Sequence, residues 1–93
     1  MRIQWDPRKS RLLKENPQRR TSFEEAKILV ETLDFQLGGE LQTLDPEQFY
    51  VIGFVGAKLI TLVYEFRHDD LGEYIHLVTL WKTTKQERER FHI

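Results

Sequence analysis

The chain has 93 residues, of which 40% are hydrophobic and 12% aromatic, and its formal net charge is −1. This length fits a single domain with one core, and the apolar content argues against a disordered chain. With no cysteine, a disulfide framework, a thiolate metal site and a cysteine nucleophile are excluded. Since it also has no signal-peptide core and no apolar run of about 20 residues, we expect a soluble, cytoplasmic protein without a membrane partner.

The near-neutral total hides an uneven distribution of charge. Residues 1–20 carry a net charge of +5 and residues 82–93 one of +2, whereas residues 21–81 carry −8. If the fold brings the two basic ends together, their side chains would form an anion-binding patch. Solvated helix faces explain the same pattern equally well.

A strand and a basic helix are predicted at the start of the chain. Residues 1–5 alternate between apolar and polar side chains, as a short strand does. Asp6 then provides a helix N-cap, and Pro7 suits the first helical position because its missing N–H group costs nothing there. We expect this helix to run from about Pro7 to Glu15 and to end before Pro17.

A second helix is predicted to begin at a capping box. Ser22 and Glu25 have the residue types and the spacing with which each side chain bonds the other residue's backbone N–H. Apolar residues follow at spacings of three and four, which predicts one continuous helix as far as Leu33. This is the clearest helical signal in the chain.

The second half of the sequence predicts β-strands and a terminal helix. Gly38-Gly39 predicts a turn in a short hairpin between residues 35–37 and 40–42. Three strands follow, with short links that favour antiparallel pairing, at residues 49–55, 58–67 and 73–82. A second capping box, Thr84 with Glu87, then opens a short helix.

Alternation assigns the side chains of the strands to two faces of the sheet. In the strand 58–67, Ile60, Leu62, Tyr64 and Phe66 share one face, and the other face is mixed. In the strand 73–82, strict alternation places His76, Val78, Leu80 and Lys82 together. We expect one face to carry helices and the other to be exposed or covered by a partner. The predicted fold class is α+β, an antiparallel sheet with two N-terminal helices and a short C-terminal helix.

The sequence lacks several familiar sites. No glycine-rich phosphate loop is present, because Gly38-Gly39 is not followed by Lys-Ser/Thr. The three histidines, His68, His76 and His92, are far apart in sequence and include no helical pair, so we expect neither a metal site nor a cofactor.

Cationic and imidazole chemistry remains, which is sufficient for a metal-independent ribonuclease. Such an enzyme holds a phosphate, stabilises the negative charge of the transition state, and moves protons at the 2′-OH and the 5′-oxygen. The catalytic candidates are Arg67, His76 and Lys82, and the candidates for binding RNA phosphates are Lys9, Arg11, Lys85 and Arg88. Each has a structural alternative: a solvated cation, or in the case of His76 a histidine satisfied within the fold.

Four segments carry a resemblance to a known family. They are Trp5-Asp6-Pro7-x-Lys9, residues 21–26 (Thr-Ser-Phe-Glu-Glu-Ala), the strand pair with Tyr50–Phe54, Leu59–Tyr64 and Arg67, and Lys82-x-Thr84-Lys85-x-Glu87-Arg88. In this order, and over nearly the whole chain, they resemble the BrnT-type toxins, the ribonuclease half of a type II toxin–antitoxin pair. The resemblance implies a RelE-like fold, metal-independent cleavage of RNA that inhibits translation, neutralisation by a cognate antitoxin, and binding of operator DNA only through the antitoxin complex.

Two departures from the family pattern keep a second interpretation open. The family usually has Lys-His-Gly before its Ser-Phe-Glu-Glu motif, whereas residues 16–21 of this chain contain no histidine. It usually has Ser-Ala-Arg before the closing lysine, where this chain has Thr79-Leu80-Trp81. The alternative is therefore a catalytically weakened interaction module that binds an antitoxin-like partner. Direct DNA binding by this chain alone is a weaker, third interpretation, because no helix-turn-helix is recognisable.

Overall fold

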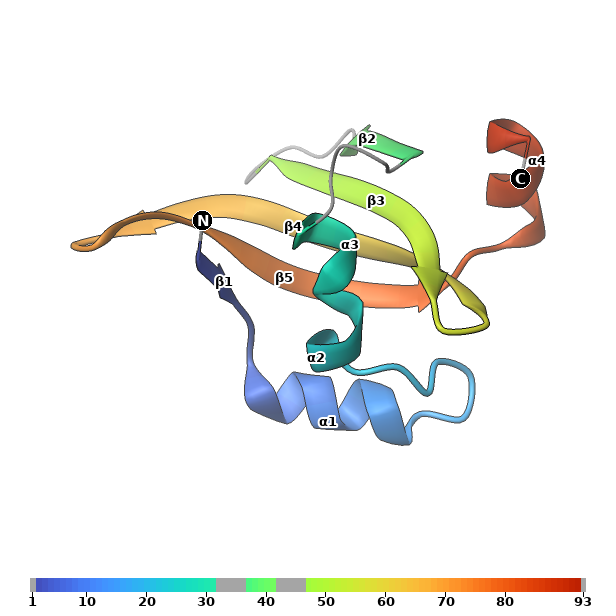
Figure 1. Cartoon of the computed structure of the whole chain (residues 1–93), viewed down its shortest axis with the longest axis horizontal. Helices are drawn as coiled ribbons and strands as arrows, with labels where there is room; N and C mark the ends of the chain where they lie inside the picture. The colour runs from blue at the N-terminus through green and yellow to red at the C-terminus, as the bar shows by residue number, and fades with distance from the viewer. Residues whose placement is uncertain (1, 32–36, 42–46, 93) are drawn as a thin grey trace.

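The computed structural model describes residues 2–31, 37–41 and 47–92, and of residues 37–41 the backbone only. The elements in chain order are β1 (Arg2–Gln4), α1 (Pro7–Glu15), α2 (Phe23–Ala26), α3 (Ile28–Glu31), β2 (Leu37–Leu41), β3 (Gln48–Val55), β4 (Lys58–Asp69), β5 (Gly72–Lys82) and α4 (Lys85–Phe91) (Figure 1). The α+β class predicted from the sequence is confirmed. None of the helices in the described part of the chain has the length and apolar content needed to cross a membrane.

The five strands form one mixed sheet in the order β1-β5-β4-β3-β2. Strands β2 to β5 pair antiparallel, but β1 runs parallel to β5, with Arg2 opposite Tyr74 and Gln4 opposite His76. The expectation of a purely antiparallel sheet was therefore wrong at this edge. Strands β1 and β5 are separated by most of the chain, so no tight turn sets their relative direction, and the long connection permits parallel pairing.

The predicted helix starts are confirmed. The Asp6 carboxylate accepts a hydrogen bond from the Arg8 backbone N–H at 2.9 Å, with Pro7 in the first turn of α1. Both capping boxes are complete, Ser22 with Glu25 at the start of α2 and Thr84 with Glu87 at the start of α4. In each of these boxes, two backbone N–H groups that the helix leaves free are bonded.

The single helix predicted from Ser22 to Leu33 is wrong in its continuity. The chain forms two short helices, α2 and α3, with a turn at Lys27 between them. There the backbone N–H of Val30 bonds the carbonyl of Lys27, three residues back, at 3.1 Å. Neither proline nor glycine occurs at this point, so the sequence carries no signal for the break. Residues 32 and 33 lie outside the described residues.

The hairpin predicted around Gly38-Gly39 is also wrong. Both glycines lie inside strand β2, where Gly38 pairs with Val51 and Gly39 with Tyr50. A glycine pair has a local preference for tight hairpin turns, and pairing with a neighbouring strand overrides that preference here. Here β3 offers a free edge, and a continuous strand pairs at all five positions. Residues 35, 36 and 42 of the predicted hairpin lie outside the described residues.

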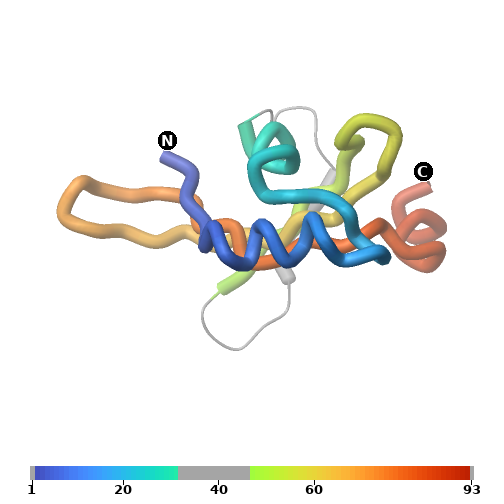
Figure 2. The backbone as a smooth tube through the Cα atoms, turned by 90° about the horizontal axis from the view of Figure 1, so that it is seen from below, coloured from blue at the N-terminus to red at the C-terminus, as the bar shows by residue number. Residues whose placement is uncertain are grey.

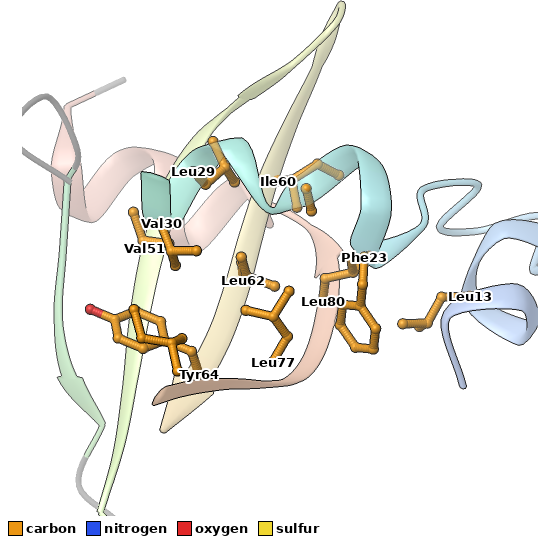
Figure 3. Packing of buried hydrophobic residues seen from close by; sticks show 12 residues of the cluster. Leu13, Phe23, Leu29, Val30, Val51, Ile60, Leu62, Tyr64, Leu77 and Leu80 are labelled. Carbon is orange, nitrogen blue, oxygen red and sulfur yellow. The ribbon is translucent and has the colours of Figure 1, made fainter. Parts of the chain in front are cut away.

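The hydrophobic core lies between one face of the sheet and the helices α2 and α3, and we call this the helix face (Figure 3). Leu29 and Val30 of α3 lie over β3 and β4, and Phe23 of α2 reaches Leu80 and Leu13. The buried sheet residues of this cluster are Val51, Ile60, Leu62, Tyr64, Ile75, Leu77 and Leu80. The assignment of β4 residues 60, 62 and 64 to one face is thus confirmed.

The face assignment of β5 is wrong beyond Leu77, because the strand contains a bulge. Tyr64 lies opposite Leu77 but Val63 lies opposite Thr79, which leaves Val78 without a partner on β4. One extra residue reverses the alternation that follows it. Leu80 therefore joins Leu77 in the core and is fully buried.

The hairpin of β4 and β5 projects beyond the rest of the sheet (Figure 2). It extends past the first residue of β3 and turns between Asp69 and Gly72. At its outer edge the guanidinium of Arg2 donates two hydrogen bonds to the Asp69 carboxylate, at 2.6 and 3.1 Å, and one to the carbonyl of Gly72. These bonds tie the N-terminal strand to the tip of the hairpin.

Candidate functional site

The sheet face opposite α2 and α3, which we call the second face, is covered at one end by α4. The Glu87 carboxylate accepts hydrogen bonds from the Thr61 hydroxyl at 3.1 Å and from the Trp81 indole at 2.9 Å. The ring of Phe91 packs against Tyr50, with 5.8 Å between the ring centroids. Burial raises the pKa of Glu87, but hydrogen bonds from Thr84, Trp81 and Thr61 outweigh it and the pKa lies below its usual value. An ionised carboxylate thus holds α4 on the sheet.

Toward the β4–β5 hairpin, the second face carries a buried carboxylate paired with an arginine. Glu65 is 2% exposed, and its Oε1 accepts two hydrogen bonds from Arg67, from Nε at 2.8 Å and from Nη2. Its Oε2 faces the Gln48 amide nitrogen at 3.4 Å. The side chain of Arg67 remains 47% exposed. Because residues i and i+2 of a strand share a face, the guanidinium is held at the surface with a fixed partner beneath it.

His76 lies beside this pair, directly opposite Glu65 on the neighbouring strand. Its partial burial lowers the pKa of the imidazole, and so do the positive charges of Arg67 and Lys9, while Glu65 and Asp6 act in the opposite direction. The net shift is downward, so the imidazole is neutral at pH 7 and able to accept a proton. Lys9 belongs to α1, which lies beneath β5 in Figure 1.

Arg67 and His76 thus lie on the neighbouring strands β4 and β5, and Lys9 of α1 is near enough for its charge to act on the imidazole; we call these three residues the Arg67–His76 site. Two of the three are cations, and the third is a neutral base at pH 7. Arg67 and Lys9 are exposed. This combination suits a phosphate whose neighbouring hydroxyl must lose a proton.

The structure does not bring Lys82 to this site. Lys82 pairs with Ile60 in the register of the helix face, whereas His76 pairs with Glu65 in that of the second face. Six residues of strand also separate Lys82 from His76, which corresponds to roughly 20 Å. The bulge at Val78 is the cause, because without it His76 and Lys82 would share a face.

The remaining predicted phosphate-binding residues occupy two other places. Lys85 and Arg88 line an open depression at α4, together with Thr83, Glu89 and His92. Arg11 faces a depression between α1 and α2 whose lining includes Glu24 and Glu25. That second depression is lined by both charges, Lys14 with Arg11 and Glu15 with the two carboxylates of α2, so the predicted role of Arg11 stays a prediction.

Sequence reasoning missed Glu65, although a signal was present. The residue interrupts an otherwise apolar and aromatic segment, Leu62 to Phe66, where a charged side chain must be either exposed or paired. Arg67 stands two residues later, on the same face of the same strand. A charged pair at this spacing in a central strand predicts a buried carboxylate with an arginine partner.

The part of the chain that the structure describes contains no cluster of side chains that could bind a metal ion. Among those residues, no group of three or more histidine, aspartate or glutamate side chains lies close enough to hold an ion.

Comparison with known proteins gives no assignment. A scan against models of protein families finds no match to this chain, and neither does a search of curated proteins. The resemblance to BrnT-type toxins thus stays an expectation drawn from four short segments. The geometry of the Arg67–His76 site stands independently of it.

Proposed function

We propose that this chain is a metal-independent endoribonuclease, the toxin of a type II toxin–antitoxin pair with a RelE-like arrangement of its sheet and helices. The observation that carries the proposal is the position of the exposed Arg67 and of His76 on neighbouring strands, with the charge of Lys9 from α1 acting on the imidazole. The order of the four BrnT-like segments supports the class of toxin. In this proposal the substrate is cytoplasmic RNA, and its cleavage inhibits translation.

The chemistry of the Arg67–His76 site fits cleavage by the RNA's own 2′-hydroxyl group. The neutral imidazole of His76 takes the proton of the 2′-OH, whose oxygen then attacks the adjacent phosphorus. The bond from phosphorus to the 5′-oxygen breaks, and that oxygen takes a proton from solvent. Arg67 and Lys9 offset the negative charge that develops on the phosphate oxygens. The products are a 2′,3′-cyclic phosphate and a 5′-hydroxyl end.

The proposed partner is a cognate antitoxin, and operator DNA would be bound only through their complex. The described residues include large apolar side chains exposed at separate points, among them Phe54 on β3 and Leu71 at the hairpin tip. Apolar residues exposed singly are common on protein surfaces, so the proposal of an antitoxin partner is supported by the resemblance to BrnT-type toxins.

Induction in cells that lack a partner tests the enzymatic proposal. The wild-type chain should arrest growth and degrade RNA, whereas Arg67→Ala and His76→Ala should each relieve the arrest. Lys82→Ala should have a much smaller effect, because Lys82 lies away from the site, and Lys27→Ala, in the turn between α2 and α3, serves as a neutral control.

With purified protein, chelators should leave cleavage unchanged. The rate should fall as the pH drops below 6.5 through the lowered pKa of His76. Normal growth and intact RNA with folded wild-type protein would contradict the proposal.

A second function, an interaction module without catalysis, is favoured by one observation. Lys82, the lysine of the BrnT-like closing motif, lies on the other face of the sheet from Arg67 and His76. If the family mechanism needs that lysine at the site, this chain has lost it. A module would bind its partner with unchanged affinity in the Arg67→Ala and His76→Ala variants, and neither wild type nor variant would cleave RNA.

A further inference from the structure

Glu65 is the least expected residue of the second face. It is a carboxylate of 2% exposure on the central strand β4, with Val63 and Tyr64 buried next to it in sequence. Burying a charge is unfavourable unless it is paired, and an apolar residue of similar volume often serves the fold as well or better. Stability alone therefore gives no reason for a carboxylate at this position.

Glu65 contacts Arg67 directly and lies opposite His76 on the neighbouring strand. Oε1 accepts both hydrogen bonds from Arg67, and Oε2 faces Gln48, the first residue of β3. On the other side, Glu65 pairs in register with His76 of β5. No buried side-chain nitrogen or oxygen among the described residues lacks a partner, so the network is satisfied without ligand.

We propose that Glu65 is a positioning residue for the Arg67–His76 site: its buried carboxylate fixes the guanidinium of Arg67 beside His76 and balances the positive charge gathered there. The expected effect on cleavage rests on the proposed function, but the position of Arg67 beside His76 can be measured in the free protein. A long arginine side chain has many rotamers, and the two-point contact with Glu65 selects one of them before RNA arrives.

The charges that face His76 show what the removal of Glu65 would do. From β4 come Arg67 and Glu65, and from α1 and its N-cap come Lys9 and Asp6. The imidazole therefore faces two cations and two anions. Without the charge of Glu65, the cations are left with a single opposing carboxylate, and protonation of His76 becomes less favourable.

The test uses Glu65→Gln, a variant of nearly the same shape without the charge, in the absence of RNA. Nuclear magnetic resonance follows the titration of His76, assigned by comparison with His76→Ala, and the Nε–H signal of Arg67. We expect the titration of His76 to move to lower pH, and the Arg67 Nε–H to exchange faster with solvent. Glu73→Gln, on the exposed part of β5, is the control and should change neither signal. An unchanged titration together with an unchanged Arg67 signal would overturn the proposal.

A second variant separates positioning from a purely structural role. Glu65→Val removes the buried charge and leaves Arg67 free to turn into solvent, so the thermal unfolding temperature should stay the same or rise. Cleavage by both Glu65 variants should nevertheless drop on the order of 100-fold, the effect of a misplaced catalytic group. Full activity in a folded Glu65→Val protein would refute the positioning role. If wild-type protein cleaves no RNA, the proposed function fails, but the titration still decides whether Glu65 holds Arg67 beside His76.

Discussion

At the scale of single residues, two neighbouring carboxylates fix α1 to α2. Glu24 accepts hydrogen bonds from the Trp5 indole at 2.8 Å and from the Ser10 hydroxyl at 2.7 Å. Glu25 accepts one from the Lys14 ammonium at 2.7 Å while it completes the capping box of Ser22. The hydrogen bond from Ser10, followed by that from Trp5, lowers the pKa of Glu24. Because Lys9 lies in the same helix as Ser10 and Lys14, these contacts also set the position of Lys9.

Glu25 should make stability depend on pH in the acid range. The hydrogen bond from Lys14, with those from Ser22, lowers its pKa from 4.5 to about 2. A carboxylate with a lowered folded-state pKa stabilises the fold fully above pH 4.5, and this contribution is lost as the pH falls toward 2. Glu25→Gln should therefore reduce the free energy of unfolding by about 1 kcal/mol at pH 7, since the pair is largely exposed. The difference should be much smaller at pH 2, where about half of the Glu25 carboxylates are protonated in the folded state.

Urea unfolding at pH 7, 4 and 2 measures this dependence. Glu31→Gln, an exposed residue of α3, is the matched control and should stay within about 0.5 kcal/mol of wild type. A Glu25→Gln deficit of the same size at pH 2 and pH 7 would show that the carboxylate charge is not what stabilises the α1–α2 contact.

At the scale of elements, the sequence correctly predicted the features that depend on neighbouring residues, namely the helix starts and the long strands. Asp6-Pro7, the two capping boxes and the long alternating strands were readable because each depends on residues close together in the chain. The departures depend on distant partners. Strand β2 forms across two glycines because β3 lies beside it, and the parallel direction of β1 depends on β5, a partner from the other half of the chain.

The bulge at Val78 had the largest consequence for the candidate site. A run of mixed residues such as Leu77-Val78-Thr79-Leu80 fits either phase of alternation, so only the register against β4 reveals the extra residue. Strict alternation placed His76 and Lys82 on the same face of the sheet, whereas the bulge places them on opposite faces. The nearness of Arg67 and His76 follows from the antiparallel pairing of the two strands that the sequence predicted. The burial of Glu65 beneath them was not foreseen.

A pair of substitutions tests the bulge. Leu80→Ala should destabilise the protein by about 2–5 kcal/mol, because Leu80 is fully buried in the core. Val78→Ala should cost less than about 1.5 kcal/mol, since Val78 stands outside the β4–β5 register and is partly exposed. Strict alternation would instead place the two residues on one face. Chemical denaturation of both variants measures the change in the free energy of unfolding. An equal decrease in the two variants would contradict the bulge.

At the scale of the whole molecule, the basic ends of the sequence do not form one patch. Strand β1 joins β5 near the hairpin, so Arg2 and Lys9 lie toward the end of the sheet that carries Arg67. Helix α4 lies at the other end, and the two chain termini are on opposite sides of the molecule (Figures 1 and 2). Cations therefore lie at several places: Arg67 and Lys9 at the Arg67–His76 site, Lys85 and Arg88 at the α4 depression, and Arg19, which donates a hydrogen bond to the Leu80 carbonyl, on the helix-face end of β5.

The most direct measurement is the map of backbone amide shifts on addition of a short single-stranded RNA. Methylation of its 2′-hydroxyl groups prevents cleavage and keeps the complex intact. We predict that the largest shifts fall on Glu65–Arg67, on Tyr74–His76 and around Lys9. Two results would contradict a site built on Arg67 and His76. One is that the shifts are confined to Thr83–His92, and the other is that no shifts appear at RNA concentrations that saturate other proteins that bind single-stranded RNA.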